Sequence, residues 1–202
     1  MHLICLDLEG VLIPEIWISF AEYTGIAEFR KTTRDEPDYN KLMLYRLDLL
    51  SKNKLKLPDI KKAIGTMDPL SGAGDFLKRL RERTQVIILS DTFQEFASPL
   101  MKKLDYPTLF CNSFVTSDDG TISDYKLRQE KGKKSAVLAF KSLGFKVFAS
   151  GDSYNDIEML LAADSGCLFR SPKPIREAYP QFPCADSFEE LDEKIDSFLA
   201  GL

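Results

Sequence analysis

The sequence predicts an α/β fold, a doubly wound (Rossmann-like) parallel sheet core with a small helical cap insertion. Three short apolar runs, at residues 2–8, 85–89 and 147–149, have the composition of strands that are buried on both faces. Segments with helical spacing alternate with these runs, which is typical of a doubly wound sheet. A chain of 202 residues is long enough for one sizeable core and one insertion.

The region between the first two strands has the pattern of a separate helical unit. Leucines at positions 42, 44, 47, 49 and 50 form an apolar face at helical spacing. Because these helices precede any second strand, we expect them to cover the crevice at the end of the sheet. We therefore assign residues 1–13 and 69–202 to the core and residues 14–68 to the cap. The cap helices are expected at Glu15–Thr24, Tyr39–Lys52 and Asp59–Ile64.

Local signals place the remaining core elements. Ser71 is the expected N-cap of a helix that follows it. The turn sequence Asp118-Asp119-Gly120 lies between two alternating segments and predicts a hairpin within residues 114–127. Gly144 is placed to end a helix that opens at Lys133 or Lys134. Further helices are expected at Phe93–Leu104, Ile157–Ala163 and Phe188–Leu199, and short strands at Thr108–Cys111 and Cys167–Phe169.

Composition excludes several classes of function. A content of 44% hydrophobic and 29% charged residues is typical of a soluble globular protein. A net charge of -4 and an isoelectric point near 5.2 argue against nucleic acid as the partner. Neither an apolar span of about 18 residues nor a leader segment is visible, so we expect a cytoplasmic protein with no membrane partner. The four cysteines have no metal-ligand spacing and are expected to be free thiols, and the single histidine makes a serine–histidine–aspartate mechanism implausible.

Polar residues follow each of the three predicted strands. Asp7 ends the first strand, Ser90 the second and Asp152 the third. The carboxyl ends of parallel strands meet at one edge of a sheet, where open α/β sheets bind their ligands. In an extended strand, Asp7 and Glu9 would lie on the same face as neighbouring like charges. Carboxylates, a hydroxyl and a lysine are the composition of a magnesium-assisted phosphoryl-transfer site, in which Asp7 is the candidate nucleophile and Asp152 the candidate cation ligand.

Four segments resemble, in order, the motifs of the haloacid dehalogenase superfamily of phosphatases. They are Asp7-Leu8-Glu9-Gly10-Val11, Ser90, Lys133 and Gly151-Asp152-Ser153-Tyr154-Asn155-Asp156. The resemblance covers nearly the whole chain. The helical insertion is similar to the cap of the phosphoserine phosphatase branch. As a whole, the chain most resembles bacterial members of that branch that can also pass phosphate to homoserine.

The resemblance implies a role for each matching residue. It implies that Mg²⁺ is held by Asp7, by Asp152 and by the backbone carbonyl of Glu9. Glu9 also takes the place of the aspartate that usually serves the family as general acid and base, and it reaches one methylene further. Ser90 and Asn155 would contact the phosphoryl group or the substrate. Lys133, or Lys134 in its place, would neutralise the phosphoryl charge.

The resemblance also indicates how a phosphorylated amino acid would be recognised. A free amino acid presents one ammonium and one carboxylate, which call for an acid and an arginine. Glu15 and Arg46 stand where the branch places these substrate-reading residues, although a helix N-terminal acid and a solvated helix arginine are the alternatives. Asp91 follows Ser90 where phosphoserine phosphatases usually have glycine. We count Asp91 among the substrate-facing residues, and its charge argues against strict specificity for phosphoserine.

Three functions are weighed against these residues. The first is a magnesium-dependent phosphatase that acts on O-phosphoserine, as in serine biosynthesis, through an aspartyl-phosphate. The second is a phosphotransferase that passes the phosphoryl group to another alcohol such as homoserine. A signalling receiver domain, the third, would lack both the helical insertion and residues 151–156. The expected partner is a small phosphorylated amino acid, and a homodimer is compatible with the sequence.

Overall fold

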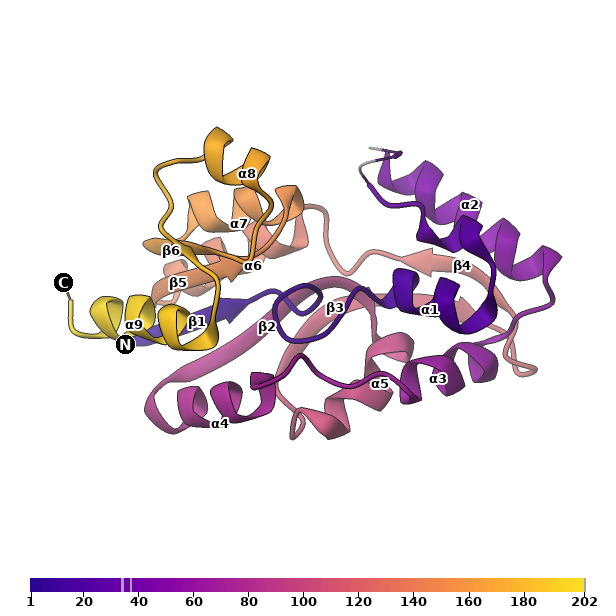
Figure 1. The fold of residues 1–202 in the computed structure, drawn as a ribbon, viewed down its shortest axis with the longest axis horizontal. Coiled ribbons are helices and arrows are strands. Elements are labelled where there is room, and N and C mark those ends of the chain that lie inside the picture. Colours follow the sequence, from indigo (N-terminus) through magenta and orange to yellow (C-terminus); the bar gives the residue numbers. More distant parts are fainter. Residues whose placement is uncertain (34, 37, 202) are drawn as a thin grey trace.

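The computed structural model describes residues 1–33, 35–36 and 38–201 and confirms the predicted α/β architecture (Figure 1). Within this part of the chain, seven strands form one sheet in the order β4-β3-β2-β1-β5-β6-β7. Neighbouring strands pair in parallel except β3 and β4, which are antiparallel. The strands are β1 (His2–Leu6), β2 (Gln85–Phe93), β3 (Leu109–Thr116), β4 (Ile122–Lys126), β5 (Lys146–Gly151), β6 (Ser165–Phe169) and β7 (Cys184–Ala185).

The central strand β1 is apolar throughout its inner length because both of its faces are covered. Ile4 and Leu6 belong to one cluster of buried side chains, whereas Leu3 and Cys5 belong to a second cluster on the opposite face. This division follows the alternation of side chains along a strand. A continuous apolar run at this position is therefore the expected signature of a strand between two layers of helices.

Helices cover both faces of the sheet, as Figure 1 shows. One face carries α4 (Ala73–Arg83), α5 (Gln94–Lys103) and α9 (Phe188–Leu199), whose apolar residues join the cluster of Ile4. The other face carries α6 (Gly132–Ser142), α7 (Ile157–Ala162) and α8 (Lys173–Ala178), whose apolar residues join the cluster of Leu3. The short 3-10 helix η2 (Tyr154–Asp156) leads from β5 into α7.

The insertion between β1 and α4 is helical, as predicted. It comprises α1 (Ile16–Thr24), the 3-10 helix η1 (Ala27–Arg30), α2 (Tyr39–Lys52) and α3 (Leu57–Gly65), and it lies beyond the end of β1 (Figure 1). Its side chains continue the core cluster, because the Trp17 ring packs edge-on against Phe96 of α5 at 5.2 Å between ring centres. The exact division at residues 13/14 and 68/69 stays a prediction.

The β3–β4 hairpin ties the insertion to the core at a second place. The backbone N–H of Leu57 donates to the carbonyl of Gly120 at 2.9 Å, and the Tyr125 hydroxyl donates to Asn40 Oδ1 at 2.8 Å. The hairpin turn itself is where the Asp118-Asp119-Gly120 signal predicts it. The β3–β4 hairpin, which is distant from the insertion in the sequence, thus helps to hold the insertion against the core.

Two local predictions are wrong. Ser71 is not the N-cap of the following helix, since α4 begins at Ala73 and Gly72 occupies the N-cap position with a left-handed φ of 83°. The second strand does not end at Leu89 but continues to Phe93, because pairing with β3 resumes there after a shift of register. The polar sequence after Leu89 therefore marks an irregularity inside the strand.

The four cysteines are free thiols, as expected. In the described residues, no helix has the length and apolarity that a bilayer crossing requires.

Candidate active site

One cavity of about 360 Å³ lies at the carboxyl ends of β1, β2 and β5. All nine residues that the sequence singles out line it: Asp7, Glu9, Glu15, Arg46, Ser90, Asp91, Lys133, Asp152 and Asn155. They come from both the core and the insertion. The predicted convergence of the strand ends on one edge of the sheet is therefore found.

Asp7 is held by two donors at the bottom of this cavity. Its Oδ1 atom accepts from the backbone N–H of Leu8 at 2.8 Å and forms an ion pair with Lys133 Nζ at 2.8 Å. Both contacts fall on the same oxygen, so Oδ2 takes part in neither. Burial and the neighbouring carboxylate of Asp156 raise the pKa of Asp7, while Lys133 lowers it. The result is a fixed carboxylate with one oxygen directed away from its anchors.

Lys133 is the lysine of the site. It is buried, and besides Asp7 it donates to Asp156 Oδ1 at 2.7 Å. The two carboxylates raise the pKa of Lys133 against the opposing effect of burial, so it stays charged. Lys134 instead points outward, 3.8 Å from Glu158. The structure thus decides between the two lysines that the sequence left open.

Sequence reasoning missed the role of Asp156. This side chain is fully buried, and its Oδ2 accepts from the backbone N–H groups of Asp152 and Ser153 at 3.0 and 3.1 Å. Gly151 makes room for it, because a Cβ atom there would stand 2.2 Å from Asp156 Cγ. The available signal was the spacing: a glycine and two acids four residues apart, at the end of a strand.

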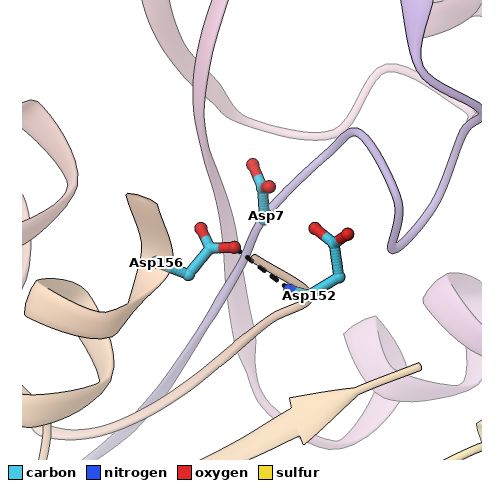
Figure 2. A group of neighbouring side chains, drawn as sticks. All are labelled: Asp7, Asp152 and Asp156. Carbon is cyan, nitrogen blue, oxygen red and sulfur yellow. Dashed lines mark hydrogen bonds between the residues drawn. The ribbon is translucent and has the colours of Figure 1, made fainter. Parts of the chain in front are cut away.

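Asp7, Asp152 and Asp156 form a group that suits a divalent cation (Figure 2). Each can offer one carboxylate oxygen, and these oxygens lie within 4.8 Å of one another. Lys133 offsets only part of their negative charge, and burial together with Asp156 raises the pKa of Asp152 to about 7. Hard oxygen donors of this kind are the ligands that Mg²⁺ prefers. The Glu9 side chain is outside this group, and a contribution from its carbonyl stays a prediction.

Gly10 is required for this arrangement, which leads to a first prediction. Its φ is 74°, and a Cβ atom would lie 2.5 Å from Asp152 Cγ. We expect Gly10→Ala to raise the apparent dissociation constant for Mg²⁺ by about tenfold or more, as when the support of a metal ligand is removed. Magnesium titration followed through the melting temperature measures this change.

Gly25→Ala is the matched control for Gly10→Ala. Gly25 has a nearly equal φ of 71°, but its Cβ would meet nothing within 4 Å. Both variants should therefore lose about 1–2 kcal/mol of stability from the left-handed backbone, and only Gly10→Ala should lose magnesium affinity. Equal magnesium affinity in both variants would remove Asp152 from the cation site.

Glu9 lies beside Glu15, not beside Asp7 as the strand pattern suggested. The strand ends at Leu6, so its alternation does not extend to Glu9. Glu9 Oε2 instead accepts from the backbone N–H of Ile16 at 2.9 Å and so caps the first turn of α1. Burial and the adjacent Glu15 carboxyl raise the pKa of Glu9 to about 8. A carboxyl group with this pKa can both donate and accept a proton near neutral pH.

Glu15 precedes α1 without capping it. It occupies the N-cap position, yet its side chain makes no capping hydrogen bond. It is exposed at the cavity, where Glu9 is its neighbour. The position of Glu15 still suits an acid that complements the dipole of α1, and a role in binding substrate stays a prediction.

Arg46 is buried in the cavity wall, which excludes the solvated alternative. Its guanidinium stacks on the Trp17 ring at 4.5 Å from the ring centre, and Nη2 donates to the carbonyl of Lys31 at 2.9 Å. Burial lowers its pKa to about 10. Among the described residues, its Nε atom is buried without a hydrogen-bond partner. An unpaired donor of this kind is costly unless a ligand group completes it.

Ser90, Asp91 and Asn155 complete the wall on the other side. Ser90 is buried and its Oγ accepts from the backbone N–H of Thr92 at 3.2 Å. Asn155 Nδ2 donates to Asp91 Oδ2 at 3.0 Å, and Asn155 Oδ1 accepts from the Ser153 hydroxyl. The carboxylate of Asp91, the residue after Ser90, therefore has a hydrogen-bond donor in Asn155.

Comparison with known proteins finds phosphoserine phosphatases that are similar to this chain. A phosphoserine phosphatase of Pseudomonas syringae pv. tomato is 52% identical over 194 residues, which span 96% of this chain and 82% of the relative. The phosphoserine phosphatase ThrH of Pseudomonas aeruginosa is 52% identical over 191 residues, which span 95% of this chain and 93% of the relative. A crystal structure of a phosphoserine phosphatase in apo form matches the fold with a TM-score of 0.76 at 24% identity, over 96% of this chain and 98% of the other.

The profile of one protein family also matches residues 1–164 of the 202. The matched segment includes every residue of the cavity described above. From this match, and from relatives that are 52% identical over nearly the whole chain, we conclude that the chain belongs to the haloacid dehalogenase-like hydrolases.

Proposed function

We propose that this hydrolase removes the phosphate of O-phosphoserine through an aspartyl-phosphate on Asp7. The observation that carries the proposal is the buried Asp7 carboxylate, anchored through one oxygen by Lys133 and Leu8 in a cavity that also contains Arg46 and Glu15. The names of the two Pseudomonas relatives support phosphoserine as the substrate. Phosphate release from a panel of phosphorylated amino acids and sugars tests the substrate directly.

The chemistry divides between two carboxyl groups. Asp7 attacks phosphorus through its free oxygen, the bond to the ester oxygen breaks, and Glu9 donates a proton to the departing alkoxide. In the second half, the Glu9 carboxylate takes a proton from water, and the oxygen attacks phosphorus to release inorganic phosphate and regenerate Asp7. The raised pKa of Glu9, about 8, supports this exchange of roles because the protonated form predominates at pH 7.

Mg²⁺ is the expected cofactor, and Asp7, Asp152 and Asp156 are the side chains that would hold it or orient its ligands. When bound, it supplies the positive charge that lets an anionic nucleophile approach an anionic phosphate. Lys133 contributes further charge from the protein itself. Ser90 and Asn155 line the same cavity and are placed to contact the phosphoryl oxygens.

Recognition of the amino acid is assigned to the insertion. The Arg46 guanidinium lines the cavity and can pair with a carboxylate, and Glu15 offers an acid to the ammonium group. Arg46 belongs to α2 and Glu15 occupies the N-cap position of α1, so the cap would bind the part of the substrate that does not react. Binding energy from such a part can be used to align the reacting groups and exclude water.

A second prediction tests this assignment. Arg46→Ala should cost about 2–5 kcal/mol in kcat/KM for phosphoserine, since it truncates one partner of a desolvated charge pair. For phosphoethanolamine, which has no carboxylate, the cost should be small. The measurement is the ratio of kcat/KM for the two substrates in wild type and variant.

Arg30→Ala is the control for Arg46→Ala. Arg30 carries the same charge in the same insertion, but its partner is the exposed Glu22 at 3.1 Å. It should leave the substrate ratio unchanged. If Arg46→Ala lowers both substrates equally, Arg46 supports the cap or the phosphate and the amino-acid assignment fails.

Phosphate transfer to a second alcohol such as homoserine is the alternative. One observation favours it: a second cavity of about 700 Å³ adjoins the first and shares four lining residues with it, Thr33, Tyr39, Asp91 and Asn155. That space can admit an acceptor next to Asp91 and Asn155, which also line the cavity of Asp7. Both functions use the same intermediate, so the proportion of phosphohomoserine to inorganic phosphate distinguishes them.

A further inference from the structure

Asp91 has a fixed position between the two cavities. Its carbonyl accepts from the Tyr39 hydroxyl at 3.1 Å and from Asn112 Nδ2 at 3.0 Å. Its carboxylate accepts from Asn155 Nδ2 at 3.0 Å and lies 3.7 Å from Lys133 Nζ. These contacts hold both the backbone and the side chain, so the carboxylate cannot turn away from the site without breaking them.

The charge of Asp91 opposes the ligand that the site receives. The side chain is 43% exposed and lines the cavity of Asp7, one residue after Ser90. Lys133, whose Nζ lies 3.7 Å from the Asp91 carboxylate, already pairs with Asp7 and Asp156. A further carboxylate therefore adds repulsion to any phosphate dianion in this cavity.

The neutral contact of Asp91 is separable from its charge. Asn155 would keep a hydrogen-bond acceptor if residue 91 were asparagine, because an amide oxygen can replace the carboxylate oxygen. The geometry of Asn155, which also accepts from Ser153, does not itself require a negative charge. The negative charge of Asp91 weakens phosphate binding, so we look for a step of the catalytic cycle in which weaker phosphate binding is an advantage.

We propose that Asp91 weakens the hold of the site on free inorganic phosphate and so speeds the release of the product. The inference rests on the proposed phosphatase function, but it concerns phosphate itself and not the alcohol from which it came. During the reaction, the phosphoryl group is bonded to Asp7 and cannot leave. Once the aspartyl-phosphate is hydrolysed, only non-covalent contacts retain the inorganic phosphate. The nearby carboxylate of Asp91 lowers the total binding energy of these contacts.

The test is equilibrium binding of inorganic phosphate to the magnesium-loaded protein by calorimetry, in wild type and in Asp91→Asn. We expect Asp91→Asn to bind phosphate on the order of tenfold more tightly, with the gain decreasing as salt is added. In steady state, the variant should show stronger product inhibition and a kcat limited by release. Asp118→Asn is the control, since it removes one carboxylate from the exposed hairpin turn. It should leave both the phosphate affinity and the product inhibition unchanged.

Asp91→Ala separates charge from positioning. It removes the charge and the acceptor for Asn155 together, so it should also bind phosphate more tightly than wild type while losing kcat/KM. Unchanged or weaker phosphate binding in Asp91→Asn would overturn the proposal, and so would a gain that is independent of salt. Phosphoserine is absent from the titration, so a wrong substrate assignment leaves the result readable.

Discussion

Asp7→Asn should reduce turnover to below about one hundredth of wild type, because an amide cannot form the phosphorylated intermediate. The fold should survive the change. Burial and Asp156 already raise the pKa of Asp7, which means that its negative charge is unfavourable where it stands. Lys133 retains its ion pair with Asp156 in the variant. Initial rates and thermal unfolding of the same preparation measure both expectations.

Asp152→Asn is the contrast for this variant. It leaves the nucleophile in place and should raise the magnesium concentration at half-saturation. Phosphoserine that is labelled in its phosphoryl group should transfer the label to wild-type protein and to Asp152→Asn at saturating magnesium. It should not transfer the label to Asp7→Asn. Activity of Asp7→Asn above one hundredth of wild type would show that another group is the nucleophile.

Glu9→Gln is expected to slow turnover by a factor on the order of 10²–10⁴, the usual worth of general acid–base assistance. Glutamine can still accept from the backbone N–H of Ile16, so the start of α1 should persist. It can neither protonate a leaving alkoxide nor activate water. Both halves of the reaction with phosphoserine should therefore be slower.

The choice of substrate isolates the acid from the base. p-Nitrophenyl phosphate has a leaving group that needs little protonation, so the variant should still form the phosphoenzyme with it and then hydrolyse it slowly. Rapid quenching should trap the accumulated intermediate. Equal impairment with both substrates and no trapped phosphoenzyme would assign Glu9 to a structural role.

The sequence predicts the framework of the site well because the framework is local. The apolar runs of β1 and β5 end where these strands end, and Asp7 and Asp152 follow directly. Helices of the insertion were visible from their own spacing. The doubly wound arrangement then follows from the order of these elements.

What the sequence could not give depends on contacts between distant segments. Glu9 was paired with Asp7 by strand alternation, but the start of α1 brings Glu15 and the N–H of Ile16 to it instead. Asp156 was overlooked because its burial depends on the turn after β5 and on Lys133 from another helix. The extension of β2 beyond Leu89 likewise depends on pairing with β3.

The strand order has a consequence for how the protein folds during its synthesis on the ribosome. β1 precedes the other described strands in the chain, yet it lies between β2 and β5, and the N–H of Asp7 donates to the carbonyl of Ser150 at 2.9 Å. Closing contacts of such separation requires that most of the chain has already emerged. A nascent chain that ends before residue 150 lacks this bond and also lacks Asp152, so the complete site forms only after most of the chain has been synthesised.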